Sequence, residues 1–183
     1  MISEQDLVKG CQRGKAKYQR LLYERYAPKM LGICMRYFHS KEEAQDALQD
    51  GFVKIYSKIK GFKGDGSFEG WIRRIMVNTS LNLYRSNLKR MYHSDVDDEK
   101  VQIADSSVDY DQFNVQDIMK LIQDLPDGYR IIFNMFEIDG YSHKEIANSL
   151  QISVNTSKSQ LLKARAHLRK ELERLHKEKT NEY

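Results

Sequence analysis

The chain has 183 residues, a length that fits one domain or two small ones. Its two cysteines are too few for a disulfide framework or a cysteine-rich zinc site, which indicates a reducing cytoplasm. The sequence begins with no signal peptide and holds no apolar run of membrane length, so we expect no membrane insertion.

Charge is strongly segregated along the chain, although the net charge is only +4. Residues 1–90 carry 18 basic and 9 acidic side chains, residues 91–125 carry 2 and 9, and residues 126–183 carry 10 and 8. Two basic lobes flanking an acidic segment indicate a polyanionic partner. An ordinary disordered linker with no partner of its own is the default explanation of the acidic segment.

Helical periodicity without convincing strand alternation predicts an all-α chain. In the N-terminal lobe, Ser3 and Ser40 are each followed three residues later by an acidic residue, which is typical of a helix start. Cys34 lies in an apolar helical stretch and is predicted to be a small buried hydrophobe. The predicted helices run from Ser3 to near Gly14, from about Ala16 to Tyr37, from Ser40 to about Lys58 and from Phe68 to about Lys89.

The third of these helices has two distinct faces. Its buried face is predicted from residues that recur at spacings of three and four, namely Ala44, Leu48, Phe52, Ile55 and Ile59. Another side is lined by Asp46, Gln49, Asp50 and Val53. An acidic stripe in a basic lobe does not suit DNA, but it suits a protein partner with a basic surface. A solvated helix face explains the stripe about as well.

A glycine-rich loop, residues 60–68, precedes the fourth helix. It lacks the closing Gly-Lys-Ser/Thr of a phosphate-binding loop, so a nucleotide site is not expected. Glycines allow close approach of the backbone to a ligand, and aromatic rings offer stacking surfaces to unpaired bases. The candidate residues for contact with single-stranded DNA are Phe62, Lys63, Gly64, Ser67 and Phe68.

The fourth helix adds a polar arc to this candidate surface. Arg74, Asn78, Asn82 and Arg85 fall within one narrow arc, and Trp71 lies at the boundary between the arc and the core. Cationic and amide groups in a row beside an aromatic ring are typical of a platform for single-stranded DNA. For Trp71, packing in the core is the simpler alternative.

Near the C-terminus the spacing predicts a helix-turn-helix. Ser142 and Glu145 form a capping box that begins the first helix, and Ile146, Ala147 and Leu150 supply its buried stripe. Residues 151–153 make a short turn, in which Ser153 is a good N-cap for the second helix.

The second helix separates an apolar seam from a polar face. Its predicted seam consists of Val154, Ser157, Leu161, Ala164, Leu168, Leu172 and Leu175. The opposite side carries side chains that can bind base edges in the major groove, namely Thr156, Ser159, Gln160 and Lys163. Lys158 and Arg165 lie nearer the edges of the seam and suit backbone phosphates, and His143 completes the candidate DNA-binding set. An amphipathic helical pair with a basic solvated face is the plainer alternative.

In this combination of motifs the chain resembles the extracytoplasmic-function (ECF) sigma factors of bacterial RNA polymerase. The most specific match is AQDALQDGFVKIYSKIKGFKGDGSFEGWIRRIMVNTSLNLYR, from Ala44 to Arg85, and the C-terminal lobe looks like sigma region 4 from LIQDLPDGYRIIFNMFEIDGYSHKEIA onward. The resemblance implies two small helical domains joined by a flexible linker: sigma region 2 at residues 1–90, an acidic linker at 91–113 and sigma region 4 at 114–183.

The resemblance also implies roles for named residues. Asp46, Gln49, Asp50 and Phe52 match positions that dock on the clamp helices of the polymerase β′ subunit. The loop at 62–68 matches the family loop that captures a flipped base of the −10 element, and Asn78 matches a position that holds the opened strand. The second helix of the C-terminal pair matches the reader of the −35 element, although Asn155 and Gln160 stand where glycine and arginine are common.

For the whole protein, the resemblance implies a sigma factor that binds core polymerase through region 2 and the β flap through region 4. It further implies promoter DNA as a partner and an anti-sigma factor as an inhibitor. Two alternatives come from other classes of protein. A dimeric duplex-binding regulator explains the C-terminal lobe only. A metal-dependent nuclease needs clustered ligands, whereas the five histidines are scattered in sequence, so no enzyme activity, metal or cofactor is expected.

Overall fold

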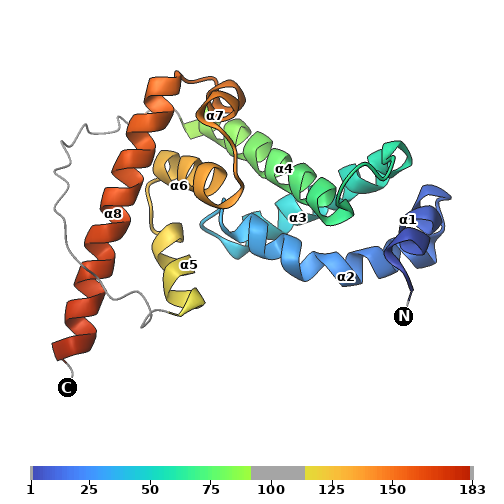
Figure 1. Ribbon diagram of the computed structural model, residues 1–183, viewed down its shortest axis with the longest axis horizontal. Coiled ribbons are helices and arrows are strands. Elements are labelled where there is room, and N and C mark those ends of the chain that lie inside the picture. The colour runs from blue at the N-terminus through green and yellow to red at the C-terminus, as the bar shows by residue number, and fades with distance from the viewer. Residues whose placement is uncertain (1, 92–113, 182–183) are drawn as a thin grey trace. The chain divides into compact units, whose positions relative to one another are not determined.

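The computed structural model of this chain describes residues 2–91 and 114–181, which divide into two compact units, Met1–Arg90 and Met91–Tyr183 (Figure 1). Within these described ranges both units are built of helices and no strand occurs, which confirms the all-α prediction with two helical domains. The predicted acidic linker lies outside the described residues except for Met91.

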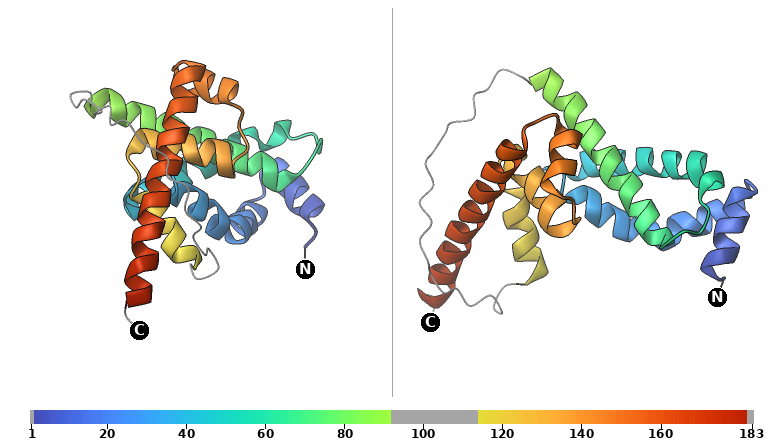
Figure 2. Two further views of the ribbon diagram at one scale, coloured as in Figure 1. Left: turned by 60° about the vertical axis from the view of Figure 1, so that its left-hand side comes forward. Right: turned by 45° about the horizontal axis from the view of Figure 1, so that its top comes forward.

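The first unit contains the four predicted helices. They are α1 (Glu4–Gln12), α2 (Ala16–Met35), α3 (Lys41–Lys58) and α4 (Phe68–Met91), with the short 3₁₀ turn η1 (Ile59–Gly61) after α3. α2 packs against both α1 and α3 (Figure 2). The η1 turn contacts α1 as well as α3. The helix ends agree with the sequence prediction to within a few residues.

Serine caps begin two of these helices, as predicted. The Ser3 hydroxyl accepts a hydrogen bond from the Asp6 backbone N–H at 3.1 Å, and the Ser40 hydroxyl accepts one from the Glu43 N–H at 3.1 Å. Each bond satisfies one of the backbone donors that a helix leaves unpaired at its start.

The core of the first unit lies between α2, α3 and α4. Cys34 of α2 is fully buried, as predicted, and the Ser80 hydroxyl of α4 donates to its sulfur at 3.9 Å. Gly51 lets α4 approach α3 closely, because a Cβ atom there would lie 2.2 Å from the sulfur of the buried Met76. Four predicted core residues of α3 (Ala44, Leu48, Phe52 and Ile55) and Ile59 in η1 are buried, so the predicted face is confirmed.

In the second unit, four short segments precede one long helix in the chain. They are α5 (Val115–Gln123), α6 (Asp127–Phe133), the π-helical turn η2 (Asn134–Ile138) and α7 (His143–Leu150), and the long helix is α8 (Val154–Asn181). α5, α6 and α7 each pack against α8 (Figure 1). The helix-turn-helix prediction corresponds to α7 and α8.

The caps of the helix-turn-helix follow the sequence pattern. Ser142 and Glu145 form the reciprocal capping box of α7, and the Ser153 hydroxyl accepts from the Thr156 N–H at 2.9 Å. Gln151 ends α7 in the left-handed region, with φ of 57°. That conformation turns the chain back into α8 within three residues, and it is less favourable for glutamine than for glycine.

α5, α6 and η2 were not expected from the sequence pattern. Their junction is held by Arg130, which is only 2% exposed and reaches the Gln123 and Leu125 carbonyls at 3.1 and 3.4 Å and the Asp127 carboxylate at 2.7 Å. One buried guanidinium thus ties the end of α5 to the start of α6.

The predicted seam of α8 is buried only in part. Ser157, Leu161 and Ala164 are buried, whereas Leu168, Leu172 and Leu175 are half-buried. Val154, at the start of α8, is also half-buried, so the seam prediction holds fully only from Ser157 to Ala164. Among the residues described, no helix is both long and apolar enough to cross a membrane.

Candidate nucleic-acid and protein interfaces

The acidic stripe on α3 is a continuous exposed surface. Asp46, Gln49 and Asp50 are exposed together, and Val53 beside them is 62% exposed. Their spacings of three and four place them on one side of the helix, away from the core residues. The prediction that these residues share an exposed face is confirmed.

Phe52 differs from the other members of this candidate interface. Its side chain is only 3% exposed, and its ring lies 4.7 Å from the Tyr23 ring and 5.9 Å from the Tyr56 ring. It also lines an apolar groove between α2 and α3, together with Pro28 and Val53. Phe52 therefore belongs to the core and to the floor of a groove that adjoins the acidic stripe.

The glycine-rich loop is exposed and is shaped by two left-handed glycines. Gly64 and Gly66 have φ values of +87° and +96°, and a Cβ atom at either position would meet nothing within 4 Å. Space therefore does not require glycine here, but backbone conformation does. Lys63, Gly64 and Ser67 are exposed, as expected for residues that contact a ligand.

Phe62, Phe68 and Trp71 form one aromatic cluster at the base of this loop. The ring of Phe62 lies 5.1 Å from that of Phe68 and 5.3 Å from that of Trp71, and the Phe68 and Trp71 rings are 5.8 Å apart. Phe68 is 2% exposed, whereas Phe62 and Trp71 are half-buried. The packing alternative for Trp71 is therefore realised, yet part of its ring still faces solvent.

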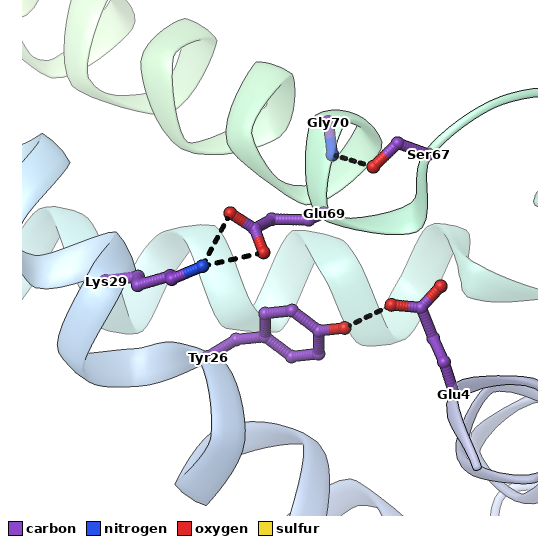
Figure 3. Close-up of polar contacts among 6 residues, drawn as sticks. All are labelled: Glu4, Tyr26, Lys29, Ser67, Glu69 and Gly70. Carbon is purple, nitrogen blue, oxygen red and sulfur yellow. Dashed lines mark hydrogen bonds and ion pairs between the residues drawn. The ribbon is translucent and has the colours of Figure 1, made fainter.

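Contacts that the sequence analysis missed hold both ends of the loop. Gln12 in α1 donates through its side-chain amide to the Ile59 and Phe62 carbonyls at 3.2 and 3.0 Å. At the other end, the Ser67 hydroxyl accepts from the Gly70 N–H at 3.2 Å, and α4 begins there (Figure 3). Partners of Gln12 lie 47 and 50 residues away, so no local signal could have revealed them.

Two side chains of α2 extend this support through three hydrogen bonds (Figure 3). Lys29 binds the Glu69 carboxylate with N···O distances of 2.9 and 3.0 Å, and the Tyr26 hydroxyl donates to Glu4 at 2.6 Å. Burial and the hydrogen bond to Glu4 both raise the pKa of Tyr26 well above its ordinary value. Tyr26 therefore stays a donor, and it links α1 to α2 beside the start of α4.

The polar arc on α4 lies beyond the aromatic cluster. Arg74, Asn78 and Asn82 are exposed, and Arg85 is half-buried with its guanidinium 3.5 Å from the Asn82 side-chain oxygen. These positions lie within one narrow arc of the helix, as the spacing predicted. Loop, ring cluster and arc are continuous along the chain and combine exposed donors with partly exposed rings.

His143 is the first residue of α7, and its side chain reaches α8. Its Nδ1 is 2.9 Å from the Ser157 hydroxyl, and its ring stacks on Phe136 with centroids 4.4 Å apart. Burial lowers the pKa of His143, and the positive charges of Lys158 and Arg165 lower it further. The His143 ring is half-buried. It connects the two helices of the helix-turn-helix and lies near two basic side chains.

The polar face of α8 is only partly free. Lys158 and Ser159 are exposed, whereas Thr156, Gln160 and Lys163 are half-buried. Thr156 shares a hydrogen bond with the Ser153 hydroxyl at 2.8 Å, and Gln160 lies over Gly128, where a Cβ atom would come within 2.9 Å of its oxygen. The face predicted to read bases is therefore present, with Gln160 resting on α6.

Arg165 has a partner that the sequence analysis missed. Its Nε donates to the Glu137 carboxylate at 2.7 Å, and its guanidinium lies 5.9 Å from the centre of the Phe136 ring. Both partners come from the π-helical turn η2. A phosphate bound by Arg165 would compete with Glu137.

Within the described parts of the chain, no three His, Cys, Asp or Glu side chains are grouped so as to hold a metal ion. The surfaces above are open rather than enclosed, and they combine polar side chains with an apolar groove and an aromatic cluster. They suit binding of large partners.

Two family models match the chain. The model described as Sigma-70 region 2 matches residues 22–90, and the model described as Sigma-70, region 4 matches residues 115–168. The first match covers the acidic stripe, the loop and the polar arc, and the second covers α5 to the first half of α8.

Whole-chain relatives agree with these matches. The RNA polymerase sigma-H factor of Pseudomonas aeruginosa is 31% identical over 96% of this chain and 96% of its own length. The ECF RNA polymerase sigma-E factor of Escherichia coli K12 is 31% identical over 90% of this chain and 91% of its own length. A solved structure of the sigma factor RpoE in complex with the anti-sigma factor NepR from Bartonella quintana has a TM-score of 0.51 at 22% identity, and the match covers 85% of this chain and 96% of that one.

Proposed function

This chain belongs to the sigma-70 family as an ECF RNA polymerase sigma factor that directs promoter-specific transcription initiation, and from this premise we propose how its two units divide the task. Region 2, residues 1–90, binds core polymerase and opens the −10 element. Region 4, residues 114–183, reads the −35 element, and the acidic linker at 91–113 joins them.

The exposed stripe on α3 binds the clamp helices of the β′ subunit. Asp46, Gln49 and Asp50 offer carboxylates and an amide on one face of a basic lobe, which suits a basic protein surface. Phe52 supports this surface from beneath, since it is buried and lines the adjoining groove.

The loop and the arc of α4 capture the melted −10 strand. Lys63 and Ser67 present polar groups at the loop, the partly exposed rings of Phe62 and Trp71 offer stacking surfaces, and Asn78 follows on the arc. Unpairing a base costs a few kcal/mol. A surface that binds the single strand and not the duplex shifts the equilibrium toward the open state.

The start of α8 reads duplex DNA at the −35 element. Thr156, Ser159, Gln160 and Lys163 supply groups for base edges, and Lys158, Arg165 and His143 supply contacts nearer the backbone. Region 4 also binds the β flap of the polymerase.

Regulation and location follow the family. Sigma factors are DNA-binding initiation factors and not enzymes, and we infer neither a catalytic activity nor a cofactor for this chain. Because a structural relative is a complex with an anti-sigma factor, we infer that this protein has such an inhibitor, and that it acts in the cytoplasm.

The observation that supports this proposal most directly is the separation of two surfaces on one small unit. Acidic and amide groups line the exposed side of α3, while cationic and amide groups line a different helix that starts at an aromatic loop. A duplex-binding regulator needs only region 4 and accounts for neither surface.

Transcription by bacterial core polymerase on a pooled promoter library tests the proposal. We expect specific start sites only when this protein is present. Asp50→Ala should lower the affinity for core polymerase about 10-fold. Glu24→Ala, which removes an exposed acid from α2, is the matched control and should change nothing. Asn78→Ala should leave core binding intact and reduce promoter opening. If the protein binds DNA without polymerase and produces no new start sites, it acts as a duplex-binding regulator and the proposal is wrong.

A further inference from the structure

The backbone from Phe62 to Ser67 runs without helical structure between η1 and α4, and it contains the two left-handed glycines. Such a segment has many alternative shapes unless its ends are fixed. The contacts that fix them therefore decide how often the loop has the shape seen here.

Gln12 fixes the first end. Its amide nitrogen donates to the Ile59 carbonyl at 3.2 Å and to the Phe62 carbonyl at 3.0 Å. The Ile59 carbonyl also accepts from the Phe62 N–H at 3.1 Å. Three hydrogen bonds thus meet at the turn where the loop begins, and two of them come from a single half-buried side chain in α1.

The second end depends on more exposed contacts (Figure 3). Ser67 caps the first turn of α4 through the Gly70 N–H, and Lys29 binds Glu69 with side chains that are 65% and 44% exposed. Because an exposed ion pair is screened by water and salt, it restrains the loop less than the half-buried amide does.

We propose that Gln12 is a positioning residue for the base-capturing loop, so that α1 controls promoter opening without touching DNA. This inference rests on the function proposed above for the loop. Gln12 precedes residue 22, where the match to region 2 begins, so the family match assigns it no role.

The amide of glutamine suits this task because its two N–H groups reach two carbonyls at once. Without it, the loop spends only a fraction of its time in the competent shape, and the apparent affinity for the captured base falls by that fraction. We therefore expect an effect on base capture and not on assembly of the holoenzyme, since the stripe on α3 lies elsewhere in the unit.

The test combines Gln12→Met with promoter templates that carry an abasic site at each −10 position in turn. Methionine keeps the length and helix propensity of glutamine but has no donor. In the reconstituted holoenzyme, opening is followed by the fluorescence of 2-aminopurine placed in the −10 element. Gln19→Met, at a half-buried glutamine of α2, is the matched control and should open promoters as the wild type does.

For the wild type, one abasic site should reduce opening sharply and so identify the captured base. On the intact template, Gln12→Met should open about 10-fold less well. On the template that lacks the captured base, Gln12→Met and the wild type should differ by less than 2-fold, because the loop then has nothing to capture. Core affinity and the unfolding midpoint should not change.

Other outcomes would overturn the inference. An equal loss on both templates, unchanged opening, or a Gln12→Met chain that does not fold would each exclude a role confined to positioning. If no abasic site affects the wild type, the proposed base capture itself is wrong, which is a distinct result. Gln12→Glu, which keeps the shape and removes the donors, should match or exceed the loss seen with Gln12→Met.

Discussion

At the scale of single residues, His143 is held in surroundings that disfavour its protonation. Its ring stacks on Phe136, and Lys158 and Arg165 add positive charge nearby. Burial is the largest cause of its lowered pKa, and the two cations act in the same direction. The neutral ring can still exchange a hydrogen bond with Ser157, whichever nitrogen carries the proton.

This environment makes region 4 sensitive to acid. Because the folded pKa of His143 lies below the unfolded value of 6.5, the unfolded chain binds the proton more readily. The stability that the neutral ring contributes is complete above pH 6.5 and is lost as the pH falls through the folded pKa. Titration of the His143 ring by NMR should therefore give a pKa below 6.5. A pKa at or above 6.5 would show that neither burial nor the two cations disfavours protonation of this ring.

At the scale of elements, Gly10 sets the distance between α1 and α2. A Cβ atom at this position would lie 2.1 Å from Cγ of Tyr18 and within 2.6 Å of two further ring atoms. Since Cγ moves only when the Tyr18 side chain takes another χ1 rotamer, relief of this contact needs a new rotamer or a shift of one of the helices. Any shift of α1 also carries Gln12 away from the loop.

Two glycine substitutions separate this close approach from helix propensity. In a helix, glycine to alanine is worth about 0.5–1 kcal/mol of stability. Gly32 is exposed in α2, and a Cβ atom there would have nothing within 4 Å, so Gly32→Ala should stabilise the protein by that amount. Gly10→Ala should instead lose about 1 kcal/mol, because overpacking costs about 1–3 kcal/mol. Trp71 is the only tryptophan, so its fluorescence during urea unfolding reports on region 2 alone.

The direction of the shift in the urea midpoint decides between the two explanations. Opposite shifts in the urea midpoint for Gly10→Ala and Gly32→Ala would support the close approach. Stabilisation by both substitutions would mean that Tyr18 moves aside without cost. In that case α1 would be more loosely seated than its contacts suggest.

Elements with local signals were predictable, and contacts between distant segments were not. The caps at Ser3, Ser40 and Ser142 depend on residues three positions away, so the sequence displays them directly. The exposed stripe and the arc follow from helical spacing alone. By contrast, Gln12 and the loop are 47 and 50 residues apart, and Glu137 and Arg165 are 28 apart.

The π-helical turn shows a second limit of the sequence. Residues 134–138 carry no pattern that distinguishes a π turn from the end of an α-helix. The turn nevertheless brings Phe136 to His143 and Glu137 to Arg165. Partners of two predicted DNA-binding residues thus came from a segment whose local structure the sequence pattern did not predict.

At the scale of the whole molecule, the chain divides into two units, and each unit carries one of the two proposed DNA-binding surfaces. Energetic effects of substitutions that share no contacts are expected to add. If the units act independently within the holoenzyme, a loss in region 2 and a loss in region 4 should therefore sum as free energies of promoter binding.

Salt dependence gives this expectation a measurable form. Promoter affinity of the holoenzyme is followed by anisotropy over a range of salt, and its logarithm is plotted against the logarithm of the salt concentration. The slope of this plot should be smaller in magnitude by about 0.9 for Lys158→Ala, at a duplex phosphate, and by about 0.7 for Arg74→Ala, at the single strand. The double variant should show both decreases together. Arg73→Ala, one residue from Arg74 but on another side of α4, should leave the slope unchanged. The double variant could instead bind the promoter no more weakly than the weaker-binding of the two single variants. That result would mean that one unit cannot bind until the other has bound, so that the two sites act as one.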